Sequence, residues 1–389
     1  MRIGVMADVY QTHLSGVTNH IRLNKEYFEG QGHQVYVFAF GPKNPTRQDE
    51  SLCIAPGLPL THTYYWGAGY PQEFVRLLQS MDIVHVHHPF VSGRLAVKYC
   101  HDRGVPLVFT NHTRYDLYLR YYLPWMPPRL GERYLKSYLP GFCRTMDCVI
   151  SPSQSIKQVL QTWGVDANIR VIPNGVNTGL YKTNTGMLNR LAYGFRKEDV
   201  VLVYVGRVSK EKNLRTLFEA FRIAAAQNER IKLLVVGDGP ERAYLAQYVL
   251  THGLCDRVTF TGQVEYERVV DLLALADVFV TASISEVMPL TLIEALAAGM
   301  PVLGVASPGI SDIVQDGFNG FTTREDAQCL AEKIVVLAQD TALRMRLSFQ
   351  ARQSAQCYTV ERTAAQLLSL YTEVIAARQA GRPAQMGMT

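Results

Sequence analysis

The sequence predicts an α/β protein with two Rossmann-like halves in tandem, each built on a parallel sheet. Short runs rich in Val and Ile alternate with stretches long enough for a helix, a pattern typical of parallel sheets covered by helices. The runs also form two series separated by a pause. The first series is Ile3–Met6, Val35–Phe38, Ile83–Val86, Leu107–Thr110, Cys148–Ser151 and Ile169–Ile172. The second is Val200–Val205, Lys232–Val236, Val258–Thr261, Val278–Thr281 and Val302–Val305.

The pause between the two series places the domain boundary. A chain of 389 residues is long enough for two domains of ordinary size. The stretch 177–198 is polar and irregular, which suits a linker. We therefore expect one domain over residues 1–178, a second over 179–358, a final helix over 359–378 and a flexible tail over 379–389.

Composition excludes several classes of protein. Hydrophobic residues make up 48% and charged residues 19% of the chain, as in globular proteins. The seven cysteines are an odd number and form no C-x-x-C pair, which argues against a zinc site or a disulfide framework and for a reducing compartment. The N-terminus lacks the features of a signal peptide, and no apolar run approaches the roughly 18 residues of a membrane span. We expect a cytoplasmic protein, soluble or peripheral.

The loops that follow the strands are the places to look for function, because ligands of open α/β sheets bind beyond the carboxyl ends of the strands. After the first strand, Gly16 opens an expected helix, where backbone N–H groups could approach an anion. An ordinary turn glycine explains this position equally well. The loop lacks the G-x-G-x-x-G pattern, which disfavours a dinucleotide site.

The second half carries two cations and two acids in such loops. Arg207 and Lys212, five residues apart after a strand, could clamp a diphosphate, although a pair of solvated surface cations is the commoner explanation. Glu286 lies in a later loop and Glu294 in the helix that follows. Carboxylates accept hydrogen bonds from hydroxyl groups such as those of a ribose or a hexose.

In the first half, His112 directly follows a strand of buried character. A lone histidine is more often structural, but its position favours contact with a sugar hydroxyl or a phosphate. The sequence has no D-x-D, H-E-x-x-H or G-x-S-x-G pattern and no Walker loop. We therefore expect catalysis without a bound metal and without a tightly bound cofactor.

Taken together, these loops closely resemble those of the retaining GT-B glycosyltransferases of family 4 (group 1). The resemblance covers nearly the whole chain, and the matching segments are D-x-Y-x-x-x-x-S-G-V from Asp8, V-H-H-P-F at Val86–Phe90, N-H-T-x-Y-D-x-Y at Asn111–Tyr118, S-P-S at Ser151–Ser153, I-P-N-G-V-N at Ile172–Asn177, G-R-V-S-K-E-K-N from Gly206, V-V-G-D-G-P at Val235–Pro240, and E-x7-E from Glu286. It implies two Rossmann-like domains that face each other across a cleft and a C-terminal helix that returns to the first domain.

The resemblance also implies roles for individual residues. Gly16, Arg207 and Lys212 would meet the diphosphate of a nucleotide-sugar donor. His112 and Glu286 would meet the donor sugar, Glu294 the ribose, and the backbone around Val264 the base. Met288, Pro289 and Leu290 would also belong to the donor site. The sequence departs from the family here, because many members have Gly-Phe-Gly after the first glutamate, whereas this chain has Val287-Met288-Pro289. Pro289 lacks a backbone donor, which puts contacts to the sugar there in doubt.

A basic and aromatic segment, residues 114–144, bears on the acceptor. It holds six basic and eight aromatic residues, and those expected at a membrane or in the acceptor site are Arg114, Tyr118, Arg120, Trp125, Arg129, Arg133 and Lys136. Interleaved cations and aromatic rings favour the surface of an anionic membrane. Tyrosines that line the acceptor cleft for a soluble substrate are a serious alternative.

Within the family, the sequence looks most like bacterial and plastid glycolipid synthases that act on diacylglycerol or glycosyl-diacylglycerol. The favoured donors are UDP-glucose and UDP-galactose, and the enzyme would be peripheral on the inner face of the membrane. Alternatives are a soluble acceptor, or phosphatidylinositol with GDP-mannose, and a nucleotide-sugar epimerase or hydrolase on the same fold. No nucleic-acid-binding module is visible, and the sequence does not set the oligomeric state.

Overall fold

A computed structural model describes residues 1–10, 15–42, 50–59, 65–122, 127–182 and 190–381. Trp125, one of the expected acceptor-site residues, lies outside them. The chain forms two compact units. Unit 1 comprises Met1–Asp116, Trp125–Gly175 and Val360–Thr389, and unit 2 comprises Leu117–Pro124 and Val176–Thr359.

Unit 1 is built on a parallel sheet of seven strands in the order β3-β2-β1-β6-β7-β8-β9. Its buried runs of Val, Ile and Phe are typical of a sheet covered on both faces. The strands are β1 (Arg2–Met6), β2 (Gln34–Gly41), β3 (Leu52–Pro56), β6 (Ile83–Val86), β7 (Leu107–Thr110), β8 (Cys148–Ser151) and β9 (Ile169–Val171). A small antiparallel pair, β4 (Leu58–Pro59) and β5 (Tyr65–Trp66), stands apart from it.

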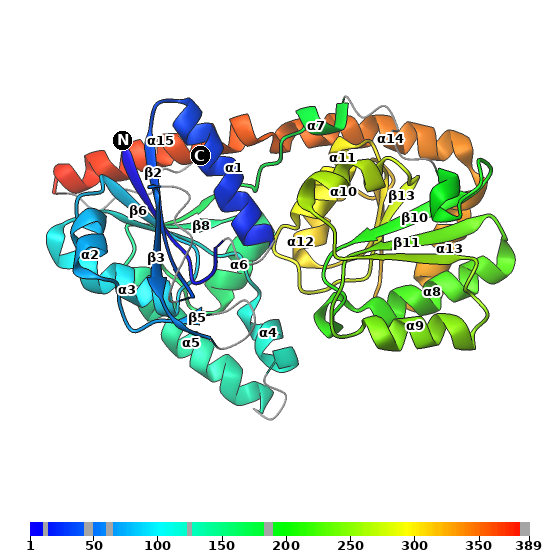
Figure 1. Cartoon of the computed structure of the whole chain (residues 1–389), viewed down its shortest axis with the longest axis horizontal. Helices are drawn as coiled ribbons and strands as arrows, with labels where there is room; N and C mark the ends of the chain where they lie inside the picture. The colour runs from blue at the N-terminus through cyan, green and yellow to red at the C-terminus, as the bar shows by residue number, and fades with distance from the viewer. Residues whose placement is uncertain (11–14, 43–49, 60–64, 123–126, 183–189, 382–389) are drawn as a thin grey trace. The chain divides into compact units, whose positions relative to one another are not determined.

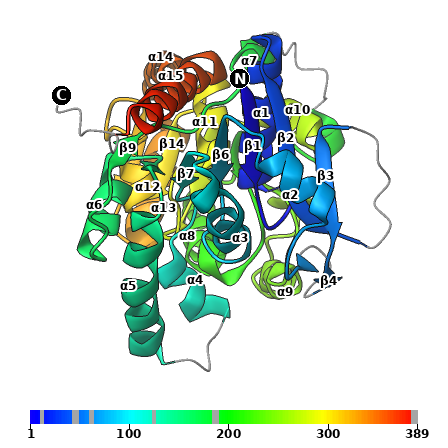
Figure 2. The same ribbon diagram turned by 90° about the vertical axis from the view of Figure 1, so that its left-hand side faces the viewer.

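Helices cover both faces of this sheet (Figure 2). Residues of α3 and α5, such as Leu95 and Leu139, pack in the core on one face, and residues of α1 and α15, such as Ile21 and Leu367, pack in the core on the other. The helices that begin in unit 1 are α1 (Gly16–Gly30), α2 (Gln72–Leu78), α3 (Val91–Cys100), α4 (Tyr115–Tyr122), α5 (Pro128–Arg144), α6 (Gln154–Thr162) and α15 (Val360–Gln379).

The C-terminal helix α15 returns to unit 1, as the resemblance implied (Figure 1). Tyr371 is 1% exposed, its ring packs edge-on against Phe28 of α1, and its hydroxyl lies 2.6 Å from Nδ1 of His85. Nε2 of His85 lies 2.6 Å from the Thr110 hydroxyl at the end of β7. The last helix therefore contributes to the polar interior from which the loop of His112 leaves.

Unit 2 is built on a parallel sheet of six strands in the order β12-β11-β10-β13-β14-β15. The first strand, β10, lies in the middle, with β11 and β13 as its neighbours. The strands are β10 (Val200–Val205), β11 (Ile231–Val236), β12 (Val258–Gly262), β13 (Val278–Thr281), β14 (Val302–Val305) and β15 (Gly320–Thr323).

Two apolar layers enclose this second sheet. Residues of α8 and α13, such as Phe218 and Ile334, pack on one face, whereas residues of α10, α11 and α14, such as Leu272 and Leu292, pack on the other. The helices are α7 (Gly179–Lys182), α8 (Leu214–Gln227), α9 (Arg242–Thr251), α10 (Tyr266–Leu273), α11 (Leu290–Ala297), α12 (Pro308–Ser311), α13 (Ala327–Gln339) and α14 (Thr341–Ala355). Each unit is thus a Rossmann-like α/β half. Across the described ranges, the structure contains no helix with the length and apolar character needed to cross a membrane.

Candidate active site

The loops after β10 and β13 bring Lys212 and Glu286 together in unit 2. The two strands are neighbours and parallel, so their loops leave the sheet at the same edge. Lys212 Nζ donates a hydrogen bond to Oε1 of Glu286 at 2.7 Å. Their side chains are only 18% and 15% exposed. The resemblance implied separate ligand contacts for these two residues, and the structure adds an ion pair between them.

Electrostatics keep the lysine of this pair charged. Burial acts to lower the pKa of Lys212, but the adjacent Glu286 carboxylate outweighs that effect, and the net result is a pKa above the usual value. A buried ion pair needs such matching charges because removal of one partner leaves the other uncompensated. The site therefore holds a charged ammonium group in a fixed position after β10, paired with the Glu286 carboxylate.

Buried polar contacts hold the two loops in register. Glu211, which is 2% exposed, accepts a hydrogen bond from the Ser209 hydroxyl on its Oε1 at 2.6 Å. Its backbone carbonyl accepts a second one from the Ser285 hydroxyl at 3.0 Å. The Glu211 carbonyl thus ties the loop of Lys212 to the loop of Glu286. Sequence reasoning missed Glu211 and Ser285. Nothing in the sequence distinguishes a buried, hydrogen-bonded glutamate or serine in a loop from an exposed one.

Three glycines allow close packing around these loops. A Cβ on Gly237 would lie 2.0 Å from the Gly206 carbonyl oxygen, and one on Gly239 would lie 2.4 Å from that of Val208. A Cβ on Gly309, in α12, would lie 2.5 Å from the Glu286 carbonyl oxygen. The G-D-G turn at 237–239 therefore supports the loop of Arg207 through backbone contact.

Arg207 and Tyr118 add to the surroundings of Lys212. Arg207 is exposed directly after β10, and its carbonyl accepts a hydrogen bond from the buried Tyr204 hydroxyl at 2.9 Å. Tyr118 belongs to the part of α4 that packs with unit 2. Burial raises the pKa of Tyr118, while the nearby Lys212 opposes the rise. Tyr118 thus lies near Lys212 and Arg207, a position that its place in the sequence does not indicate.

Glu294, on α11, is 1% exposed. Its Oε1 accepts a hydrogen bond from the Tyr266 hydroxyl at 2.8 Å, so the buried carboxylate has a polar partner. Tyr266 begins α10, directly after the loop that contains Val264. The residues expected to meet the ribose and the base therefore lie on elements that contact each other.

The unusual segment before α11 packs inward. Met288 is 6% and Leu290 5% exposed, and both side chains belong to the apolar core. Pro289 is the N-cap of α11, at φ −70°, and no side chain in the described structure caps this helix. Any ligand contact at positions 288–290 would therefore come from the backbone.

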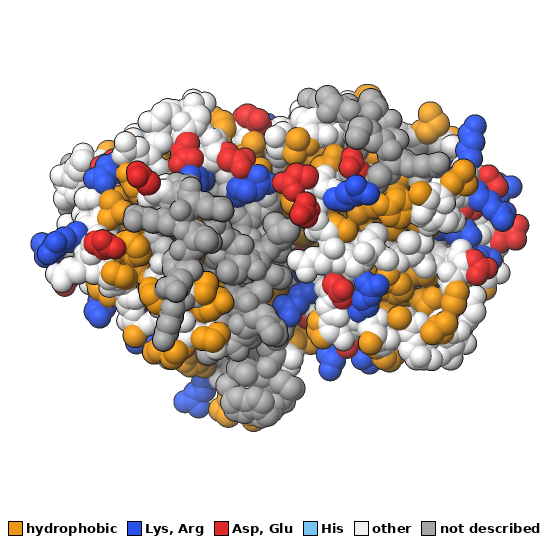
Figure 3. Space-filling view, in the orientation of Figure 1, with side chains coloured by type: hydrophobic (Ala, Val, Ile, Leu, Met, Phe, Trp, Pro, Cys, Tyr) orange, Lys and Arg blue, Asp and Glu red, His pale blue; other side chains and the backbone are white. Residues whose placement is uncertain are grey.

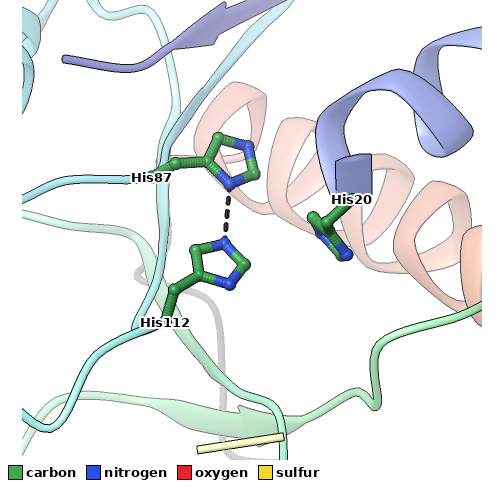
Figure 4. Close-up of side chains that lie close together, drawn as sticks. All are labelled: His20, His87 and His112. Carbon is green, nitrogen blue, oxygen red and sulfur yellow. Dashed lines mark hydrogen bonds between the residues drawn. The ribbon is translucent and has the colours of Figure 1, made fainter. Parts of the chain in front are cut away.

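In unit 1, His112 belongs to a cluster of imidazoles (Figure 4). His112 Nε2 and His87 Nδ1 lie 2.8 Å apart and the rings stack, so one nitrogen donates and the other accepts. His20, on α1, lies edge-on to both rings. Burial lowers the pKa of His20 to about 4 and holds the pKa of His87 and His112 well below the usual range. The cluster is neutral at pH 7. The hydrogen bond couples the tautomers of the two rings, because His112 Nε2 carries its proton only when His87 Nδ1 does not.

Gly16 begins α1, as expected. The helix is capped by Ser15, whose hydroxyl accepts a hydrogen bond from Thr18 N at 3.2 Å, while Thr18 Oγ1 accepts one from Ser15 N at 2.8 Å. A Cβ on Gly16 would meet no described atom within 4 Å. Packing among the described residues therefore does not require a glycine here.

The basic and aromatic segment divides into two parts. Arg114 forms a two-point ion pair with Asp116, with both side chains mostly buried, and Tyr118 faces Lys212, so neither lies on an outward surface. Arg120 is exposed on α4. The helix α5 instead has a mixed outer face, defined by five exposed residues: Arg129, Leu130, Arg133, Tyr134 and Lys136. Leu130 is 57% and Tyr134 54% exposed.

The α5 outer face lies on a helix that projects from the sheet of unit 1 (Figures 1 and 2). The space-filling view shows Lys and Arg side chains beside apolar ones toward this end of unit 1 (Figure 3). The opposite side of α5 is apolar and buried, through Leu135, Leu139 and Phe142. Cations and exposed apolar side chains therefore share one accessible face, which the sequence alone did not separate from the buried tyrosines.

Comparison with known proteins identifies the family. Residues 14–180 match Glycosyltransferase Family 4, and residues 188–354 match Glycosyl transferases group 1. The α-monoglucosyldiacylglycerol synthase of Streptococcus pneumoniae is 30% identical over 331 residues, which are 82% of this chain and 74% of that protein. The chain belongs to the family 4 (group 1) glycosyltransferases. A second α-monoglucosyldiacylglycerol synthase, from Acholeplasma laidlawii, is 26% identical over 96% of this chain and 98% of that protein.

Solved structures confirm the fold of this glycosyltransferase. Sucrose-phosphate synthase from Thermosynechococcus elongatus superposes with a TM-score of 0.79 at 23% identity, covering 97% of this chain and 99% of that one. Anabaena HepE in complex with UDP-glucose superposes with a TM-score of 0.76 at 21% identity, covering 95% and 100%. The expectation of a GT-B enzyme is therefore confirmed.

The glycine packing predicts that Gly237→Ala disturbs the Arg207 loop. The new Cβ would meet the Gly206 carbonyl oxygen at a φ of +131°. Gly253→Ala is the matched control, since Gly253 also has a positive φ, +64°, but open space around it. We expect the control to lose about 1–2 kcal/mol of unfolding free energy, from the left-handed backbone alone. Gly237→Ala should lose clearly more, measured by urea unfolding, and equal losses would refute the packing argument.

Proposed function

We propose that this glycosyltransferase moves a hexose, with retention of configuration, from a UDP-sugar to a glycerolipid. UDP-glucose and UDP-galactose are the favoured donors, and diacylglycerol or monoglycosyl-diacylglycerol is the acceptor. The observation that carries the proposal is the similarity, over most of the chain, to two enzymes named α-monoglucosyldiacylglycerol synthase. The α5 outer face supports it, because a lipid acceptor must be reached at a membrane.

The cations after β10 supply the leaving-group chemistry in this proposal. Departure of UDP develops negative charge on the β-phosphate, and Lys212 and Arg207 would stabilise that charge through preorganised contacts. The ion pair with Glu286 supports this role, since it fixes the Lys212 ammonium before the donor arrives. Gly16, at the start of α1, would let a phosphate approach the helix backbone.

Other residues would orient the donor. Glu286 and His112 would accept or donate hydrogen bonds at the sugar, Glu294 would hold the ribose, and the backbone near Val264 would meet the base. His87 would position His112 through the hydrogen bond between their rings. Retention would follow from attack on the same face as the departing phosphate, which takes the proton of the acceptor hydroxyl. Glu286 would take no role as a covalent nucleophile, because attack on the same face as the leaving phosphate needs no glycosyl-enzyme intermediate.

The membrane contact would be made by the α5 outer face. Cations on a helix are attracted to anionic lipid, and exposed apolar side chains can enter the interface between headgroups and acyl chains. Arg129, Arg133 and Lys136 provide the charge, and Leu130 and Tyr134 provide the apolar surface. The protein would then act as a peripheral enzyme on an anionic membrane.

The proposed reaction is tested by offering radiolabelled UDP-glucose, UDP-galactose and GDP-mannose with vesicles that contain diacylglycerol or monoglucosyl-diacylglycerol. We expect a labelled glycolipid from a UDP-sugar, separated by thin-layer chromatography, with the α-anomer identified by NMR. Transfer should persist in excess EDTA, because the sequence has no D-x-D and the site carries its own cations. Transfer only to a soluble acceptor would contradict the lipid acceptor. Conversion of the donor without any acceptor would contradict the transfer reaction, and loss of activity in EDTA that Mg²⁺ restores would contradict catalysis without a metal.

Lys212→Ala should lower kcat by about 10²–10³, the usual effect of losing one contact that stabilises transition-state charge. Arg207→Ala should act in the same direction. The matched control is Lys210→Ala, because Lys210 is an exposed cation in the same loop, where Lys210–Lys212 form one 3-10 turn. Turnover is measured at saturating donor, and circular dichroism checks the fold. Equal turnover in the Lys212 and Lys210 variants would mean that the diphosphate binds elsewhere.

Replacement of Arg129, Arg133 and Lys136 together by Ser should weaken binding to anionic vesicles by about 100-fold, since each cation contributes about 1 kcal/mol at such a surface. The wild type should bind neutral vesicles poorly and lose affinity for anionic ones as salt rises. Triple replacement of Lys197, Arg230 and Arg346, exposed cations of unit 2, is the matched control. Cosedimentation measures binding. Wild-type affinity in the α5 variant would remove this face as the membrane contact and favour a soluble acceptor.

A further inference from the structure

The imidazole cluster of unit 1 has the composition of a transition-metal site. His20 comes from α1, His87 follows β6 and His112 follows β7 (Figure 4). One ring nitrogen from each of the three lies within 4.8 Å of the other two. Three imidazoles with an open fourth position are a known ligand set for Zn²⁺. The cluster therefore places suitable donor atoms from three separate elements in one region of unit 1.

The state of the rings favours a metal over a proton. Metals bind the neutral imidazole, and burial lowers the pKa of all three histidines, so no proton competes near pH 7. His20 Nδ1 is buried without a hydrogen-bond partner in the described structure. The same holds for Oδ1 of Asn24, one helical turn further along α1. An unpartnered buried nitrogen beside two other imidazoles is the observation that points to a ligand.

The change needed to close the site is small. Two nitrogens bound to one tetrahedral Zn²⁺ at about 2.0–2.1 Å lie roughly 3.3 Å apart. The His87–His112 pair, now 2.8 Å apart, would open slightly, and the His20 ring would move inward. The proton of the His87–His112 hydrogen bond would shift to the other nitrogen of the ring that donates it, so that both facing nitrogens can bind the metal. The Asn24 amide nitrogen lies 3.3 Å from His20 Nε2 and donates a hydrogen bond to the His20 carbonyl at 2.7 Å. A metal on His20 Nδ1 would leave the ring proton on Nε2, so the His20 ring would turn away from this amide nitrogen as it moves inward.

We propose that His20, His87 and His112 bind a divalent transition metal, with Zn²⁺ as the reference ion, and that the bound metal inhibits the transferase. Nitrogen ligands without carboxylates favour Zn²⁺, Ni²⁺ or Cu²⁺ over Mg²⁺ or Ca²⁺. Inhibition rests on the proposed function, in which His112 contacts the donor sugar, because a metal would occupy a ring nitrogen and fix the ring away from that contact. Metal binding itself does not depend on the proposed function.

The first test is calorimetric titration of the full chain, free of any polyhistidine tag, with Zn²⁺ and with Mg²⁺. We expect one Zn²⁺ per chain and no measurable binding of Mg²⁺. His20→Gln and His87→Gln should each weaken Zn²⁺ binding by about 100-fold, since each removes one of three ligands. His101→Gln and His252→Gln, which change exposed histidines, are the controls. Equal Zn²⁺ affinity in the wild type and both cluster variants would overturn the proposal.

A second measurement keeps the test decisive if a cluster variant folds poorly. Co²⁺ added to the wild type should give the intense visible absorption of a tetrahedral site, and one equivalent of Zn²⁺ should abolish it. A weak octahedral spectrum would overturn the proposal. Inhibition is tested separately, as the ratio of transfer rates with and without Zn²⁺ in each variant. Tight Zn²⁺ binding without inhibition would keep the site and refute its link to the donor-sugar contact of His112.

Discussion

Unit 2 depends on one constraint: a mostly buried lysine and glutamate must be held together where the strand order reverses. In unit 2 the chain runs outward from β10 to β11 and β12, then returns to the other side of β10 as β13. The helices that follow these two strands, α8 and α11, therefore pack on opposite faces of the sheet, as at the switch points where doubly wound sheets bind ligands. Lys212 and Glu286 meet there at 2.7 Å, and the Glu211 carbonyl with Ser285 fixes the loops that carry them. The G-D-G turn matters for the same reason, because only glycine allows the neighbouring backbone to pack so closely.

Unit 1 repeats this geometry with different chemistry. Its first strand, β1, lies between β2 and β6, so the strand order also reverses there. Asp8, after β1, accepts a hydrogen bond from the Ser92 backbone in α3 at 2.7 Å, while His87 follows β6 and pairs with His112 after β7. Here burial leaves neutral imidazoles in place of charges. A neutral cluster suits hydroxyl groups, as on a sugar, and it equally suits a metal that competes for the same nitrogens.

The sequence predicted the strands and loops that a local pattern of residues marks. It did not predict the contacts between residues on different elements. Buried runs of Val and Ile located β1, β6 and β10, whereas β3, with its proline, and β15, a short Gly-Phe-Thr-Thr strand, lacked that pattern. Lys212, Glu286 and His112 could be singled out because loops after strands are informative positions in this fold. Their partners were missed, since Glu211, His87 and Tyr266 gain their roles only from residues on other elements. For segment 114–144 the composition was informative, but only helix geometry separated the buried Arg114 from the exposed cations of α5.

The segment Val287-Met288-Pro289 bears on sugar specificity in the proposed mechanism through its packing. Met288 and Leu290 direct their side chains into the core, and Pro289 has no backbone N–H to offer at the start of α11. In the proposed mechanism the diphosphate contacts are made by Arg207 and Lys212, so this loss leaves the leaving-group chemistry intact. In that mechanism, recognition of the hexose would fall to side chains, for which Glu286 and His112 are the proposed residues. Lys212 already occupies one carboxylate oxygen of Glu286, and His87 already occupies one ring nitrogen of His112. The orientation of the Glu286 and His112 side chains, and not the number of backbone donors, would therefore decide which hexose fits.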